Sequence, residues 1–116
     1  MPFITVRVNV SLSKSQEIEI KNLMAQAIEL IPGKNENYLM LGLEDNYKFY
    51  LRGDDSQKAA LIDAQIFGNE DHEGFNKFAA MTTKIFNRVL DIPPENIYIN
   101  FYDIRAWSVN GIFITR

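Results

Sequence analysis

The sequence has 116 residues, of which 47% are hydrophobic and 23% are charged, and this length fits a single globular domain over residues 1–116. The net charge of -3 and the scattered basic residues argue against nucleic acid as a partner, and the lack of cysteine excludes disulfides and thiolate metal sites. No apolar run approaches the roughly 20 residues that span a bilayer, which predicts a cytoplasmic protein without membrane contact.

The first half of the chain predicts a strand, a helix and a second strand. Residues 3–10 alternate between apolar and polar side chains, as in a strand with one buried face. Ser13 and Gln16 predict a helix capping box, and apolar side chains then recur at helical spacing until Pro32 ends the helix. Residues 37–43, NYLMLGL, form a nearly continuous apolar run, which predicts an interior strand covered on both faces.

The second half of the chain repeats this order of elements. Residues 59–67 alternate again, and a helical pattern follows over residues 75–90 before Pro93 and Pro94 close it. Residues 97–102, IYINFY, predict the last strand. Two strand–helix–strand units with right-handed crossovers give an α+β fold, with a four-stranded mixed sheet and two helices on one face.

A sheet covered by helices on only one face leaves its other face open. In the last predicted strand, that open face carries Tyr98, Asn100 and Tyr102. Large aromatic groups on an open sheet are usually buried against other subunits. We therefore expect a homo-oligomer.

The polar stretch GNEDHEGF precedes the second predicted helix. Its histidine, His72, has no second ligand at a metal spacing, so we expect a solvated side chain and no metal site. We expect the acidic residues Glu70, Asp71 and Glu73 to complement the positive N-terminus of the helix.

Pro2 follows the first methionine in the opening MPFITV. Methionine aminopeptidases generally remove methionine before a proline, so we expect Pro2 to become the free N-terminus. Its secondary amine would then be a candidate reactive group, whereas a retained methionine would leave an amide without useful basicity. Taken alone, a proline at the start of a strand is more often structural.

Three segments together resemble the macrophage migration inhibitory factor branch of the tautomerase superfamily. They are the opening PFITVRVNV, the PGK turn followed by Tyr38, and IPPENIYINFYDIRAW followed by Asn110 and Gly111. The resemblance runs along the whole chain and implies a trimer whose sheets enclose a central barrel. It also implies keto–enol tautomerisation of phenylpyruvate-like α-keto acids without a cofactor.

The resemblance implies that Pro2 is the general base and acid of this reaction. The base must be unprotonated near neutral pH, although a free chain terminus titrates at about 7.7 to 8.0. Burial among apolar groups, and a like charge such as Lys34 nearby, would lower its pKa. Phe3, Phe67 and Val109 could supply the apolar surroundings.

The resemblance also implies the groups that bind the substrate. Lys34 matches the lysine that holds the carboxylate, and Phe67 matches the residue whose backbone amide assists it. Tyr98 and Asn100 match residues that enter the pocket from a neighbouring subunit and could donate to the carbonyl oxygen as enolate charge develops. Tyr38 matches a position near the pocket rim.

One departure from the family pattern and two other functions bear on this reading. Val109 replaces a tryptophan that forms a hydrophobic wall in relatives, which affects the affinity for aromatic substrates. The main alternative function is a cytokine-like binding module for a protein receptor, with residual or no catalysis. The alternative to a cytoplasmic location is secretion without a signal peptide. A related hydratase or dehalogenase would need added arginines, and no pattern places Arg7 or Arg105 in the pocket.

Overall fold

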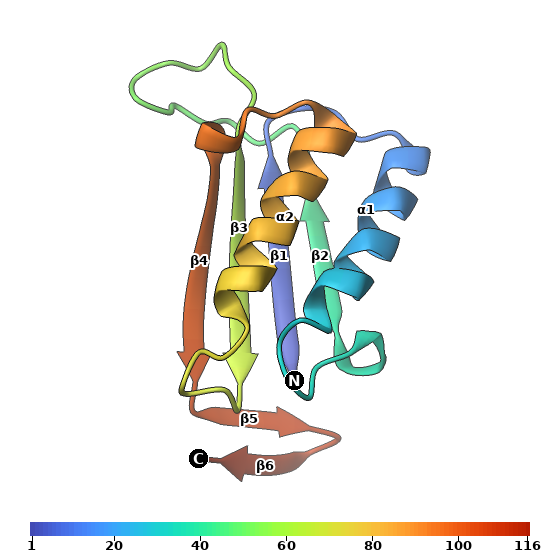
Figure 1. Cartoon of the computed structure of the whole chain (residues 1–116), viewed down its shortest axis with the longest axis vertical. Helices are drawn as coiled ribbons and strands as arrows, with labels where there is room; N and C mark the ends of the chain where they lie inside the picture. The colour runs from blue at the N-terminus through green and yellow to red at the C-terminus, as the bar shows by residue number, and fades with distance from the viewer.

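Four strands form one mixed sheet, and two helices cover one of its faces (Figure 1). The computed structural model describes residues 1–116. Its main elements are β1 (Pro2–Val8), α1 (Lys14–Ile28), β2 (Met40–Glu44), β3 (Ala60–Phe67), α2 (Phe75–Leu90), β4 (Ile97–Ile104), β5 (Ala106–Val109) and β6 (Ile112–Thr115). Short 3-10 helices precede β2 and β4, at Glu36–Tyr38 and Pro94–Asn96.

The strand order β2-β1-β3-β4 confirms the two predicted strand–helix–strand units. Each unit ends in a parallel pair, β1 with β2 and β3 with β4, and the antiparallel pair of β1 and β3 joins the units at the centre of the sheet. The hairpin of β5 and β6 is a separate two-stranded sheet that lies beyond the end of the main one (Figure 1).

The predicted capping box starts α1. The Ser13 hydroxyl accepts a hydrogen bond from the Gln16 amide at 3.1 Å, and the Gln16 side chain accepts one from the Ser13 amide at 3.0 Å. These bonds satisfy two of the amide groups that the first helical turn leaves without partners.

The hydrophobic core lies between the sheet and the two helices. Every second side chain of the central strands points into it, as the alternation predicted. Neither helix is both long and apolar enough to cross a membrane. The core side chains that are fully or almost fully buried include Ile4, Val6, Val8, Met24, Ile28, Ile62, Ala64, Ile66, Phe78 and Phe86.

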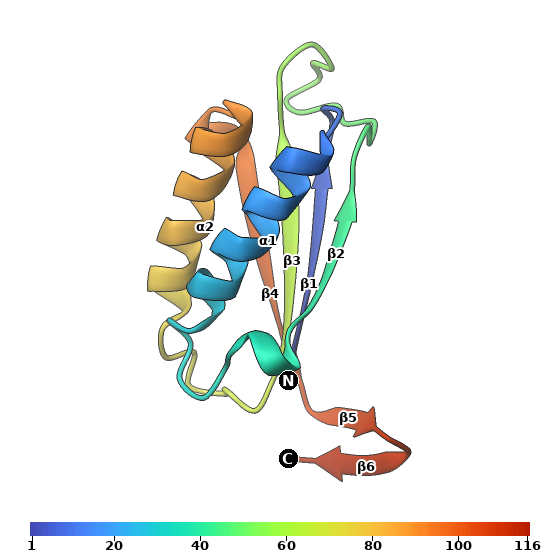
Figure 2. The same ribbon diagram turned by 90° about the vertical axis from the view of Figure 1, so that its right-hand side faces the viewer.

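The other face of the sheet has no covering layer within the chain (Figure 2). Tyr98 and Tyr102 of β4 remain 51% and 42% exposed there. The hairpin adds exposed apolar side chains, since Ile112 and Phe113 are 61% and 68% exposed. A single chain therefore leaves much aromatic and aliphatic surface in contact with water.

The prediction that residues 37–43 form an interior strand was wrong. Residues 37 and 38 belong to a 3-10 helix, and β2 begins at Met40 and forms the edge of the sheet. Leu41 and Leu43 pack against the core, but Met40 is 67% exposed. An apolar run predicts that its side chains are buried, but it does not show whether a neighbouring strand or another molecule buries them.

Candidate functional site

The start of β1 meets Lys34 and the end of β3 at one end of the sheet. Pro2 is buried and lies opposite Ile66 in the antiparallel register. The Phe67 amide donates to the Met1 carbonyl at 3.2 Å, and the Lys34 ammonium donates to the Phe67 carbonyl at 2.6 Å. Three of the predicted site residues, Pro2, Lys34 and Phe67, are therefore neighbours.

An amine at this end of β1 is driven towards its neutral form. Burial, and then the hydrogen bond and positive charge of Lys34, lower the pKa of the Met1 α-amino group to about 5. Both causes penalise a second positive charge beside the lysine. The Met1 amine is therefore unprotonated at neutral pH.

Apolar groups and a glycine shape the surroundings of Lys34. The rings of Phe67 and Trp107 lie 6.4 Å apart, which places the first strand of the hairpin against the end of β3. Gly68 follows Phe67 with a φ of +91°, a conformation that side chains rarely adopt. Val109 is 52% exposed at the end of β5.

Tyr98 and Asn100 lie away from Pro2 within the same chain. Tyr98 is opposite Leu61, five residues along β3 from Ile66, which corresponds to about 17 Å at the usual strand rise. Asn100 is opposite Asp63, with which it forms a 3.1 Å hydrogen bond. Both side chains face outwards from the uncovered face of the sheet and do not reach the Pro2 of the same chain.

Tyr38 lies at the same end of the sheet as Pro2, since β2 begins opposite Phe3 and Tyr38 comes two residues before it. Its side chain is 65% exposed. Arg7 lies farther along β1, opposite Leu61, where it forms ion pairs with Asp63 and Glu44 at 3.0 and 3.4 Å. The structure therefore leaves Arg7 outside this end of the sheet.

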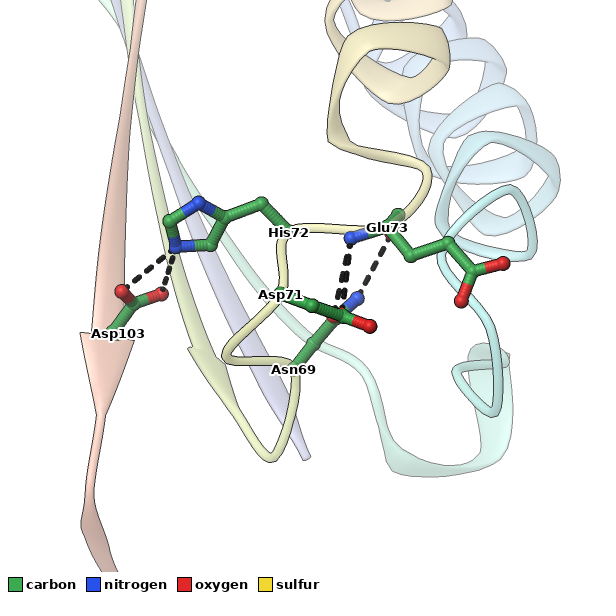
Figure 3. A network of polar contacts seen from close by, with 5 residues as sticks. All are labelled: Asn69, Asp71, His72, Glu73 and Asp103. Carbon is green, nitrogen blue, oxygen red and sulfur yellow. Dashed lines mark hydrogen bonds and ion pairs between the residues drawn. The ribbon is translucent and has the colours of Figure 1, made fainter.

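The loop between β3 and α2 places its polar side chains in contact with other parts of the chain. His72 is exposed, and its Nε2 lies 2.8 Å from the Asp103 carboxylate (Figure 3). Its ring also stacks on that of Phe75. The acidic side chains do not cap α2, whose N-cap is Gly74 without a side-chain hydrogen bond. Glu70 instead pairs with Arg116 at 2.9 Å.

Sequence reasoning missed Arg116. Its guanidinium lies beside Gly68, close to Lys34, although the two residues are far apart in the sequence. Only the hairpin of β5 and β6 returns the end of the chain to this place (Figure 1). A signal was present in the Asn110-Gly111 turn between two apolar runs, which is typical of a hairpin.

Comparison with known proteins supports the same fold and family. The family model described as macrophage migration inhibitory factor (MIF) matches residues 1–114. Among solved structures, MIF2 of Leishmania major aligns with a TM-score of 0.89 at 21% identity, covering 98% of this chain and 97% of that one. The macrophage migration inhibitory factor homologue of Prochlorococcus marinus gives 0.83 at 23% identity, covering 96% and 97%.

A third solved structure is that of Pt0534 inactivated by 2-oxo-3-pentynoate, with a TM-score of 0.83 at 14% identity and coverage of 95% and 94%. No curated protein matches the sequence. At these identities the structural likeness establishes the fold, and the family model establishes the family.

Proposed function

The chain belongs to the macrophage migration inhibitory factor family, and from this premise we propose that it is a cofactor-independent keto–enol tautomerase of phenylpyruvate-like α-keto acids. The Pro2 amine, freed by removal of Met1, is the general base and acid. One observation supports the proposal: at the start of β1, burial and Lys34 lower the pKa of the Met1 amine to about 5. We expect the same two causes to act on the Pro2 amine.

Met1 occupies the groups that the proposal assigns to the substrate. Its carbonyl accepts from the Phe67 amide, and its amine lies beside Lys34. Removal of Met1 would turn the Pro2 nitrogen into a secondary amine and would free the Phe67 amide. A substrate carboxylate could then accept from both Phe67 and Lys34, which would hold the substrate beside the base.

The reaction moves one proton and needs no redox partner. The Pro2 nitrogen takes the proton from the carbon next to the ketone, and negative charge develops on the ketone oxygen. In the proposed homotrimer, the Tyr98 phenol or the Asn100 amide of a neighbouring subunit donates a hydrogen bond to that oxygen. In this direction the Pro2 ammonium then gives the proton to the enolate oxygen. In ketonisation the Pro2 amine takes the proton from the enol oxygen and returns it to carbon.

The direct test is ketonisation of the phenylpyruvate enol, followed by its ultraviolet absorbance, with protein whose mass shows that Met1 is absent. Pro2→Gly keeps a free N-terminal amine but replaces the constrained secondary amine, and we expect the rate to fall by about 10²-fold or more. Lys34→Ala should raise KM, whereas Lys77→Ala removes an equally charged but remote side chain from α2 and should change nothing.

Complete loss of methionine without activity would overturn the tautomerase proposal. The cytokine-like binding module would then be the better reading, because the fold would have kept its terminal proline without this chemistry. The electrophile 2-oxo-3-pentynoate, which inactivates Pt0534, offers a second probe, since a neutral amine at Pro2 could add to its alkyne.

A further inference from the structure

Arg116 is held at the carboxylate-binding end of the sheet by contacts on two sides. Its amide donates to the Arg105 carbonyl at 3.0 Å, which continues the pairing of β5 and β6. Its Nε donates to the Glu70 carboxylate at 2.9 Å. Glu70 is the only side chain that hydrogen-bonds the guanidinium, so most of its N–H donors are unused.

The guanidinium and the Lys34 ammonium flank one point in space. A Cβ placed on Gly68 would lie 3.5 Å from Nη1 of Arg116 and 3.7 Å from Nζ of Lys34. Both cations therefore lie close to the same backbone position. Like charges that lie close together repel each other unless an anion lies beside them. The Glu70 carboxylate supplies part of the compensating negative charge, and a bound carboxylate would supply the rest.

The loop that carries Gly68 and Glu70 is braced by its own polar side chains (Figure 3). The buried Asn69 donates to the Glu73 carbonyl at 2.9 Å and accepts from the Glu73 amide at 3.2 Å. His72 connects the same loop to β4 through Asp103. Glu70 is therefore presented from an ordered loop, so the position of Arg116 is set before a ligand arrives.

We propose that Arg116, positioned by Glu70, is a second carboxylate-binding residue of the site, acting together with Lys34. The role of Arg116 in the reaction rests on the proposed function, whereas its binding of an anion does not. An arginine can donate two parallel hydrogen bonds to a carboxylate, which fixes the orientation of the anion as well as attracting it.

The surroundings of Arg116 select for a single carboxylate. A hollow of about 380 Å³ beside it is also lined by Glu70, Asp71 and Glu73. These acidic side chains would repel any negative charge in the hollow, so a ligand carboxylate should lie on the side of Arg116 that faces Lys34, and a second carboxylate in the hollow is disfavoured. The substrate class is therefore a 2-oxo acid with one carboxylate and an uncharged remainder, and 2-oxo dicarboxylates are poor substrates.

The test uses methionine-free protein and two measurements. The dissociation constant of benzoate, an unreactive aromatic monocarboxylate, is measured by calorimetry, and KM and kcat are measured for phenylpyruvate. Arg116→Ala should raise both the dissociation constant of benzoate and the KM for phenylpyruvate by about 10-fold, with little change in kcat. This size is expected for the loss of a charged hydrogen bond that is partly screened by solvent. Arg116→Lys should recover part of the loss.

The matched control is Arg88→Ala, which removes an exposed arginine from the last turn of α2 and should leave both constants unchanged. Phthalate, a dicarboxylate, should bind the unmutated protein more weakly than benzoate. Unchanged benzoate binding in folded Arg116→Ala, or equal losses in Arg88→Ala, would overturn the inference. Loss of benzoate binding in Arg116→Ala without ketonisation by the unmutated protein would support the inference and reject the tautomerase proposal.

Discussion

The backbone conformation and close surroundings of Gly74 leave no room for a side chain. It precedes α2 with a φ of +82°, and an added Cβ would collide with the Leu30 carbonyl oxygen. We expect Gly74→Ala to cost about 3 kcal/mol or more of unfolding free energy, from the left-handed conformation and the collision together. Gly53 has a φ of +78° but nothing within 4 Å. Gly53→Ala should cost only about 1 kcal/mol.

Urea unfolding at one protein concentration measures both losses. Equal costs for the two variants would mean that the chain around Leu30 yields easily, and would contradict the close approach of that turn to Gly74.

Residues of the site differ in how readily the sequence reveals them. Pro2 and Lys34 stand in short segments, PFITV and PGK, whose order along the chain resembles a known family. Arg116 has no such context, since its place depends on the hairpin and on Glu70 in a distant loop. When two side chains meet only through tertiary structure, no spacing in the sequence predicts their contact.

At the scale of the elements, hydrogen bonds of Asn96 connect the loop before β3 to the start of β4. It is 1% exposed, and its amide donates to the Gln57 side chain and to the Lys58 carbonyl at 3.1 and 3.0 Å. Arg52 donates to its side-chain oxygen at 2.6 Å. Asn96→Ala should cost about 2 kcal/mol, because it leaves buried polar groups without partners.

Denaturant unfolding of Asn96→Ala against Asn37→Ala isolates this effect, since Asn37 is exposed and its side chain makes no hydrogen bond. The control should stay within about 0.5 kcal/mol of the unmutated protein. A loss of the same size in both variants would show that the asparagine network does not hold the loop.

Elements with a clear period were predicted well, and the place of β2 in the sheet was not. The alternation of β1 and β3 and the capping box of α1 follow from local chemistry. The position of β2 at the edge depends instead on which strands pair with two partners, and these are β1 and β3. We expect another subunit to cover the apolar run of β2, where Met40 is exposed in the single chain.

At the scale of the whole molecule, the uncovered sheet face and the hairpin predict a homo-oligomer in solution, and the family resemblance predicts that it is a trimer. Sedimentation equilibrium of the unmutated protein at micromolar concentration should give three times the chain mass of 13.4 kDa. Phe113→Glu places a charge on an apolar side chain that is 68% exposed in the single chain, and it should shift the protein towards monomer.

Gln26→Glu adds the same charge to an exposed position of α1 and should leave the assembly intact. A monomeric unmutated protein would contradict the expected assembly and, with it, the supply of Tyr98 and Asn100 from a neighbour.

The central claim is that Pro2 carries a free, neutral amine at neutral pH, and the most direct measurement is covalent labelling by 2-oxo-3-pentynoate. Methionine-free protein is treated at pH 7, and the adduct is located by peptide mass spectrometry. The control protein carries one glycine before Pro2, which converts the reactive nitrogen into an amide. We predict a single adduct on Pro2 in the first protein and none on Pro2 in the second. An unlabelled Pro2 in the methionine-free protein would contradict the claim.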